Sequence, residues 1–174
     1  KGWKEFNIID MKTDFTIRQA QQSDAVELKE LFQNTVLVIN RRDYSQAEVE
    51  DWASCGNNLS NIKERIETHY FVVAVNQQSQ IVGFSSITPQ GYLHSMFVHK
   101  DFQGEGIATM LLEEIERYAI TAGITRITSE VSLTARPFFE KKGYVVEKEQ
   151  KRKANQLSLT NFWMAKQVIC PKNL

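Results

Sequence analysis

In the middle of the chain, a strand pattern runs through a short glycine-containing loop directly into an amphipathic helix. The strand is predicted at 91–98, and the loop contains Gln103-Gly104-Glu105-Gly106. Glycine has no Cβ atom, so a ligand can approach the backbone closely. The first turn of a helix adds unpaired N–H groups and a partial positive charge. The segment is therefore suited to bind an anion, above all a phosphate. A tight helix entry with no ligand is the alternative interpretation of Gly-x-Gly alone.

Two common phosphate motifs do not fit this loop. No Gly-Lys-Ser/Thr ending follows, so it is not a Walker A loop. A dinucleotide fingerprint needs a third glycine, which is missing here, and the strands around this loop are linked by hairpin-sized connections. The loop is therefore predicted to bind a different kind of phosphate-containing ligand.

Hydrophobic periodicity along the rest of the chain predicts a mixed α+β domain, or α/β in the broader sense. The expected element order is β-α-α-β-β-β-α-β-α-β-β, with a mostly antiparallel sheet that carries helices. Strands are expected near 15–20 and at 70–75, 80–88, 91–98, 124–131, 144–153 and 157–168. Helices are expected from residue 23 or 24 to 39, in two pieces within 44–67, and at 104–122 and 135–142.

Composition narrows the class of protein. The chain has 174 residues, 42% hydrophobic and 24% charged, enough for the core of one domain. Lys and Arg total 21 and Asp and Glu total 21, so no net charge draws the chain to nucleic acid or an anionic membrane. No apolar run approaches the roughly 18 residues of a membrane span. Cys55 and Cys170 have neither metal-type spacing nor a disulfide framework, and no secretory signal is recognisable. We expect a cytoplasmic protein without a metal, a nucleic acid or a membrane as partner.

The first residues differ from the rest of the sequence. Residues 1–10 have no clear periodicity, and Met11 precedes the first strand pattern. We expect Met11 to be the natural first residue, residues 1–14 to be an N-terminal extension, and residues 15–170 to form a single domain.

Two motifs resemble those of the GCN5-related N-acetyltransferase (GNAT) superfamily. The superfamily's pyrophosphate motif is Gln/Arg-x-x-Gly-x-Gly/Ala, and the chain has Gln103-Gly104-Glu105-Gly106-Ile107-Ala108 after the fourth predicted strand. A second motif is similar to the stretch 132–144, with the spacing kept and three residues changed. The resemblance covers roughly 16–166, and within the superfamily the chain is most similar to YafP-like bacterial proteins.

The resemblance implies a bacterial acyltransferase with acetyl-CoA as donor. It implies a GNAT fold, a mixed, mostly antiparallel sheet of six to seven strands, flanked by helices and splayed between the fourth and fifth strands. The pantetheine arm would lie in that opening and the pyrophosphate on the start of the helix. Lys141, Lys142 or Arg136 could meet the 3′-phosphate, although the two lysines also fit a solvated helix face. The cofactor-binding residues implied are Met96, Phe97, Val98, Gln103, Gly104, Glu105, Gly106, Ile107, Ala108, Thr109, Ser132, Arg136 and Phe139.

His94 is the candidate base that would accept a proton from the acceptor amine. It lies four residues before Val98, and alternation along a strand predicts that it shares a face with Tyr92, Met96 and Val98. An imidazole titrates near neutral pH and suits proton transfer. A hydrogen-bonded histidine packed under the sheet is the alternative. Glu130 on the fifth strand is the rival base, or else it orients the substrate or pairs with an arginine.

The second motif departs from the superfamily at one functional position. Phe139 stands where many members have a tyrosine that acts as general acid, and a phenyl ring has no proton to give. Tyr144, Tyr92, Ser132 or a water would have to take that role, unless the thiolate leaves unaided. We expect Tyr144 to be a catalytic residue alongside His94 and Glu130.

The acceptor site is expected to be formed by the least standard parts of the chain. Tyr44 and Trp52 in the second helical region, Tyr92 at the strand entrance and Phe162 on the last strand are the candidate substrate-binding residues. The favoured function is N-acetylation of the primary amine of a small molecule by direct attack. A protein N-acetyltransferase and a non-catalytic acyl-CoA-binding sensor are the alternatives, separated by whether the site is a closed pocket or a long groove and by whether thiol is released. Superfamily members are often homodimers, but the pattern shows no interface.

Overall fold

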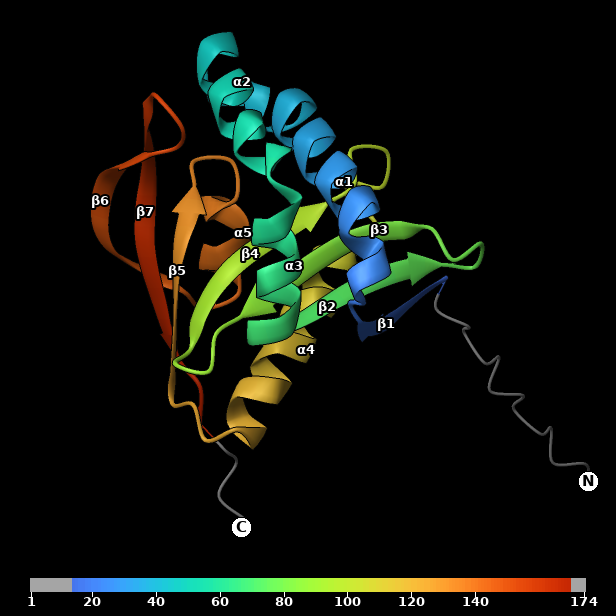
Figure 1. Ribbon diagram of the computed structural model, residues 1–174. Helices are drawn as coiled ribbons and strands as arrows, with labels where there is room; N and C mark the ends of the chain where they lie inside the picture. Colours follow the sequence, from blue (N-terminus) through green and yellow to red (C-terminus); the bar gives the residue numbers. More distant parts are fainter. Residues whose placement is uncertain (1–13, 170–174) are drawn as a thin grey trace, which may run out of the picture.

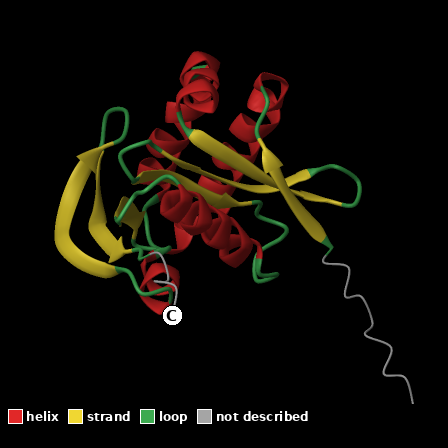
Figure 2. Cartoon of the chain, turned by 90° about the horizontal axis from the view of Figure 1, so that it is seen from below, coloured by secondary structure: helices red, strands yellow, loops and turns green. Residues whose placement is uncertain are grey.

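The computed structural model describes residues 14–169, and within them seven strands form one sheet in the order β1-β2-β3-β4-β5-β7-β6. All neighbouring strands are antiparallel except β4 and β5. Figures 1 and 2 show the β6–β7 hairpin at one edge and β1 at the other. The predicted fold is confirmed. The strands are β1 Phe15–Gln19, β2 Tyr70–Asn76, β3 Ile81–Ile87, β4 Tyr92–Val98, β5 Arg126–Ser132, β6 Val145–Lys153 and β7 Ser158–Gln167.

Helices cover both faces of this sheet (Figure 1). On one face, α1 and α3 bury Leu28, Leu31 and Ile62 against β2 and β3. On the other, α4 buries Ile107 and Leu111 in a core shared with β2, β3, β4, β5 and α5. The helices are α1 Ala25–Val38, α2 Gln46–Ser54, α3 Leu59–Thr68, α4 Ile107–Thr121 and α5 Arg136–Lys141, with short 3₁₀ turns η1 Gln22–Asp24, η2 Asn40–Arg42 and η3 Cys55–Asn57.

β4 and β5 separate soon after they meet. Only two residue pairs join them, Tyr92 with Thr128 and Leu93 with Ser129. At the point of divergence, the Ser129 hydroxyl donates to the Leu93 carbonyl at 2.8 Å, so a side chain replaces the next ladder bond. The expected splay between the fourth and fifth strands is therefore present.

The helix after the glycine loop starts later than predicted. Gly104 and Gly106 have φ of +76° and +81°, outside the right-handed helical region, so α4 begins at Ile107 rather than at residue 104. Its end is as expected, because Gly123 with φ +77° follows the last turn as a C′ glycine. The two-piece helical region is also confirmed, with η3 between α2 and α3.

Some predictions fall wholly or partly outside residues 14–169. Met11, most of the proposed extension and Cys170 are among the residues that are not described. In the described part, Cys55 is exposed and has no disulfide partner. No helix there is long and apolar enough to cross a membrane.

Candidate active site

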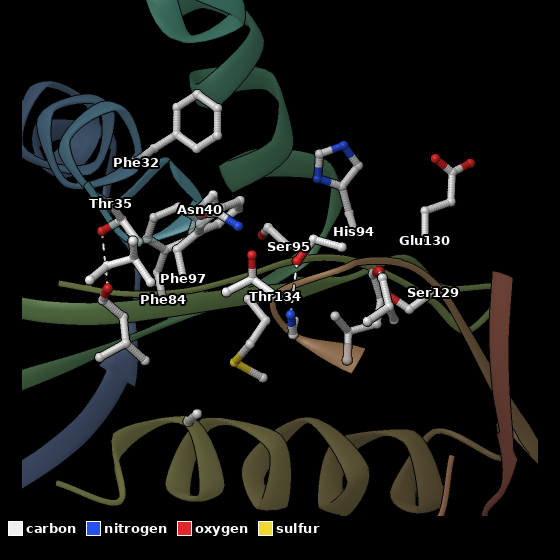
Figure 3. Close-up of a pocket in the computed structure, with 18 of the residues that line it drawn as sticks. Phe32, Thr35, Asn40, Phe84, His94, Ser95, Phe97, Ser129, Glu130 and Thr134 are labelled. Carbon is white, nitrogen blue, oxygen red and sulfur yellow. Dashed lines mark hydrogen bonds between the residues drawn. The ribbon is translucent and has the colours of Figure 1, made fainter. Parts of the chain in front are cut away.

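A cavity of about 720 Å³ passes through the sheet where β4 and β5 separate. On one face of the sheet it is lined by residues of α1, α2 and α3, and on the other by the glycine loop and the start of α4. The β6–β7 hairpin and α5 form its remaining walls. Figure 3 shows the two faces, with Phe32 and His94 above the sheet and α4 below it. The cavity therefore joins a glycine loop on one side to a group of polar side chains on the other.

The glycine loop presents backbone, not side chains, to this cavity. A Cβ atom built on Gly104 or Gly106 would meet nothing within 4 Å, so the space beside both residues is open. The amides of 107–109 lie in the first turn of α4, whose N–H groups have no partner within the helix. Five residues of this segment line the cavity, namely Gly104, Gly106, Ile107, Ala108 and Thr109, whereas the Glu105 side chain is exposed and does not. An anion placed here would meet N–H donors and the positive end of the α4 dipole.

The edge of β4 that faces the opening offers further backbone groups. The Val98 carbonyl accepts hydrogen bonds from the Thr35 hydroxyl at 3.0 Å and from Gln103 Nε2 at 2.7 Å, and neither donor belongs to β3. Backbone groups alternate in direction along a strand, so the amide of Met96 points the same way as that of Val98. Beyond Leu93, no described strand pairs with this side of β4. An extended ligand in the opening could hydrogen-bond to Met96 and Val98.

A β-bulge at His94 overturns the predicted face of this side chain. Ser95 pairs with Ser86 while Leu93 pairs with Ile87, so His94 is an extra residue on β4. Met96 and Val98 pack against the core that contains α4, whereas His94 lies on the opposite face, beside Tyr92 and under α3 (Figure 3). The prediction that all four residues share a face was wrong, because period-two alternation does not hold across a bulge.

His94 lies in an environment that keeps its imidazole neutral. Burial, together with the charges of Arg65 and His69, lowers the pKa of His94 to about 4. Its ring is 5.6 Å from the His69 ring and 5.9 Å from the Tyr92 ring, centroid to centroid. Its Nδ1 atom is buried and has no hydrogen-bond partner within residues 14–169. The side chain is thus a neutral imidazole with an unused nitrogen at the wall of the cavity.

Glu130 and Tyr92 complete the polar group near His94. Glu130 forms an ion pair with Arg152 on β6, with 3.1 Å between Oε2 and Nε, so the predicted alternative of an arginine partner is present. Tyr92 stacks on Trp163 of β7 with 5.9 Å between ring centroids. Burial and the nearby charge of Glu130 raise the pKa of Tyr92 to about 12, so its hydroxyl keeps its proton at neutral pH.

Besides Glu105, the predicted site residues Tyr144, Phe162 and Arg136 do not line the cavity. Tyr144 is 1% exposed, and its hydroxyl donates a hydrogen bond to Glu116 on α4 at 3.1 Å. It is therefore not part of the polar group formed by His94, Glu130 and Tyr92. Phe162 points to the α4 side of β7 and lies under the Arg136 guanidinium, 4.4 Å from its ring centroid. Arg136 is held by this contact with the Phe162 ring and by a hydrogen bond from its Nε to the Glu140 carboxylate. Tyr144 and Phe162 are apolar enough to be drawn into the core, which explains both corrections.

The other predicted residues do line the cavity. Phe139 is 2% exposed and packs edge-on against Tyr144, 5.1 Å between ring centroids, so it contributes an apolar wall. The Tyr44 hydroxyl is already used, donating to the Thr160 carbonyl at 2.7 Å and accepting from the Leu133 amide at 3.0 Å. The full set from the prediction is Tyr44, Trp52, Tyr92, His94, Met96, Phe97, Val98, Gln103, Ser132, Glu130 and Phe139, in addition to the loop residues above.

Further polar residues line the cavity. Thr134 Oγ1 and Asn161 Oδ1 are buried and have no partner within the described residues. Asn40 and Arg65 line it too, from η2 and α3. Asn161 directly precedes Phe162 on β7, and Thr134, Asn40 and Arg65 were not predicted as site residues. No local signal in the sequence distinguishes Arg65 from an ordinary surface residue of an amphipathic helix.

The fold and the site together define an acyltransferase that takes its acyl group from acyl-CoA. A sheet that splays open beside a glycine loop at a helix start has open space for phosphates and a free strand edge for an amide-bearing arm, so the residues present fit coenzyme A. Among residues 14–169, no group of three or more His, Cys, Asp or Glu side chains could hold a metal ion.

The family model of the acetyltransferase (GNAT) domain matches residues 40–166, and the chain belongs to this family. It is therefore an acyltransferase, with acetyl-CoA as its donor. The chain is 29% identical over 149 residues to the uncharacterized N-acetyltransferase YafP of Escherichia coli K12, covering 85% of this chain and 93% of that protein.

Solved structures show the same fold. A GCN5-related N-acetyltransferase from Rhodopseudomonas palustris superimposes with a TM-score of 0.84 at 27% identity, over 87% of this chain and 94% of that one. The PaiA N-acetyltransferase from Thermoplasma acidophilum, solved with coenzyme A, gives a TM-score of 0.72 at 19% identity, over 88% of this chain and 98% of that one.

Proposed function

We propose that this acetyltransferase transfers the acetyl group directly to the primary amine of a small molecule. The observation that carries the proposal is a contact between α2 and the β6–β7 hairpin, two elements that line the cavity. The Asp51 carboxylate on α2 accepts backbone N–H bonds from Asn155, Gln156 and Leu157 at the tip of the β6–β7 hairpin, at 2.9 to 3.1 Å. These bonds join the two elements that would form the walls of a groove for a peptide.

A cavity whose walls are joined in this way favours a small acceptor over a protein. The side chains of Trp52 and Leu159 from the joined elements line the cavity beneath the contact. A volume of about 720 Å³ is in the range of small-molecule sites. A protein acceptor would need the hairpin tip to separate from α2, at the cost of these hydrogen bonds. No feature of the described residues favours that alternative.

On the donor side, the chain supplies mainly backbone groups. The amides of 104–109 would hold the pyrophosphate, and the free edge of β4 at Met96 and Val98 would hold the amide-bearing arm. When bound, acetyl-CoA supplies an acetyl thioester. N–H groups of this edge can donate to a carbonyl oxygen that gains negative charge. Phe139 and Phe138 provide the apolar wall of this part of the cavity.

On the acceptor side, His94 accepts the proton that the amine must lose. The imidazole is neutral at physiological pH because burial lowers its pKa, and its buried Nδ1 has no partner. Glu130 is compensated by Arg152, and this pairing makes it the weaker candidate. A proton for the departing thiolate can come from Tyr92, as the sequence analysis allowed, or from the Thr134 hydroxyl, which is buried and without a partner. Direct transfer needs no nucleophilic side chain.

Two measurements test the proposal. Thermal melts with and without acetyl-CoA establish donor binding, and a saturating ligand at about 100-fold over its dissociation constant stabilises by about 2.7 kcal/mol. Release of free thiol is then measured with a panel of small amines, and with peptides that have a free N-terminus or a lysine. Thiol release with small amines alone is expected. Release with peptides alone would overturn the small-molecule acceptor, and binding without any release would point to the sensor.

A further inference from the structure

Arg65 on α3 places a guanidinium group without a protein partner at the wall of the cavity. It lies close enough to His94 and Tyr92 to influence the titration of both. Within residues 14–169, its side chain forms no ion pair within 4 Å and donates no hydrogen bond. The nearest negative group on its own helix is Glu64, which is exposed and forms no ion pair with it. Arg65 therefore has five unused N–H donors next to the candidate base.

The other charged groups at this end of the cavity have opposite charges near them. Glu130 and Arg152 form an ion pair at 3.1 Å. Lys153, which lines the cavity without an ion pair among the described residues, is near enough to the Asp51 carboxylate to help lower its pKa. Arg65 faces no carboxylate that lines the cavity within ion-pair distance, in the part of the chain that the structure describes.

A charged group in this position is unfavourable without an anion. Burial is the largest cause that lowers the pKa of Arg65, which shows that its guanidinium is partly removed from water. Structural arginines in such places are usually paired, because an unpaired charge loses its hydration without compensation. The observed arrangement is what a binding site for an anionic group requires before its ligand arrives.

We propose that Arg65 binds the carboxylate of the acceptor, so that the substrate is an amine that also contains a carboxylate, as in an amino acid. This inference rests on the proposed function and names its substrate class. The planar guanidinium can hold a carboxylate through two parallel hydrogen bonds, which fixes the orientation of the acceptor. The amine is then directed toward His94, which lies next to Arg65.

The remaining wall selects an apolar body for this substrate. Phe32, Trp52 and Phe97 line the cavity and pack edge-on against one another, with ring centroids 5.1 to 6.5 Å apart. These rings come from α1, α2 and β4. Figure 3 shows Phe32 and Phe97 on the same side of the sheet as His94. Amino acids with an apolar or aromatic side chain therefore fit better than acidic or basic ones.

The test compares acids with their amides. Thiol release is measured for the twenty amino acids and, for each one that is acetylated, for its C-terminal amide. The expected result is acetylation of apolar amino acids, with kcat/KM lower by about 100-fold for the amide, since a charge-assisted bidentate contact is lost. Equal rates for acid and amide would overturn the role of a carboxylate. If only amines that lack a carboxylate were acetylated, the role of a carboxylate would also be overturned, and the proposed function would stay intact. No release with any amine would contradict both.

Variants at Arg65 assign the effect to this residue. Arg65→Met should lower kcat/KM for the amino acid by about 100-fold, mainly through KM, and should remove most of the difference between the acid and its amide. Arg65→Lys should recover only part of the loss, because an ammonium cannot form the bidentate contact. Lys63→Met, an exposed position on the same helix that does not line the cavity, is the matched control. The acetyl-CoA-induced shift in melting temperature should be the same in all variants. Acid and amide kinetics that stay unchanged in Arg65→Met would remove Arg65 from the site. If Arg65→Met does not fold, the comparison of acid and amide with the unaltered protein still decides the proposal.

Discussion

The carboxylate of Asp51 on α2 accepts a hydrogen bond from the backbone N–H of Leu157, at 3.0 Å, across 106 positions of sequence. The bonds from Asn155 and Gln156 to the same carboxylate make it a three-residue contact with the hairpin tip. Burial opposes the charge of Asp51, but these N–H donors outweigh it and lower the pKa of the carboxyl group. One side chain thus joins three residues of the β6–β7 hairpin tip to α2.

Asp51→Asn should weaken this contact and affect the acceptor more than the donor. A neutral amide accepts N–H bonds less strongly than a carboxylate, so the hairpin tip should separate from α2 more often. KM for the amine is expected to rise several-fold, with no change in the acetyl-CoA-induced melting shift. Glu50→Gln is the control, since that neighbour only accepts a bond from the Gln46 side chain. An unaltered KM in Asp51→Asn would show that the contact does not shape the acceptor site.

His94→Gln should lower turnover on the order of 10²-fold, because the variant cannot accept the proton of the amine. Glutamine retains a polar side chain of similar reach, so the affinity for acetyl-CoA, measured by calorimetry, should hold. A turnover equal to that of the unaltered protein would exclude His94 as the base and leave Glu130 as the candidate.

The stability of the protein should fall in mild acid because of His94. The pKa of His94 is about 4 in the folded protein, against an ordinary value of 6.5. Between these values the unfolded chain binds more protons, so the free energy of unfolding decreases as pH falls from about 6.5 to about 4. For this shift the loss is up to about 3 kcal/mol. His69, whose pKa is lowered by burial and by Arg65, contributes in the same direction.

Denaturant titrations at several pH values check this prediction. In His94→Gln the decrease between pH 6.5 and 4 should be smaller than in the unaltered protein, with His69 and the carboxyl groups providing the remainder. Identical pH profiles for the two proteins would contradict the neutral, largely buried state of His94.

Gly106→Ala should reduce acetyl-CoA binding. The residue has φ +81°, so alanine is strained there by roughly 1 kcal/mol, and its methyl group would extend into the open space beside the loop. Gly123→Ala is a matched control, because that glycine has φ +77°, also has open space around it, and lies at the far end of α4. Both variants should melt at a lower temperature, and only Gly123→Ala should keep the full shift with acetyl-CoA. Equal shifts in the two would mean that the loop does not hold the phosphates.

Thr134→Val should separate function from stability. The buried hydroxyl of Thr134 has no partner within residues 14–169, so its removal should raise the free energy of unfolding by about 1 kcal/mol. If the hydroxyl gives a proton to the thiolate, turnover should decrease at the same time, by roughly tenfold. A stabilised variant with full turnover would leave Tyr92 as the proton donor.

The donor half of the site could be predicted because it is contiguous in sequence. Strand, loop and helix between Tyr92 and Thr109 follow one another, and backbone groups at helix starts depend little on distant contacts. The element order and the splay were also predictable, from periodicity together with the resemblance to a known fold.

The acceptor half depends on contacts that no local pattern contains. The Asp51 carboxylate can accept the hydrogen bond from Leu157, and Arg65 can line the cavity, only after α2, α3 and the hairpin have packed. Tyr144 and Phe162 were misplaced for a related reason, since whether an aromatic ring lines a pocket or fills a core is decided by strand parity and by neighbours far along the chain. Phe162 is one position away from Asn161, which lines the cavity.

The bulge at His94 has a consequence for comparing this chain with its relatives. One inserted residue lets a single strand display aliphatic groups on one face and an imidazole on the other within three positions. A relative without the insertion could have the same letters at the same columns of an alignment and yet present its histidine to the opposite side of the sheet. Before the role of a residue on this strand is transferred to a relative, it should be established whether the relative has the extra residue. The number of residues in the strand, and not the side-chain type, decides on which face of the sheet the histidine lies.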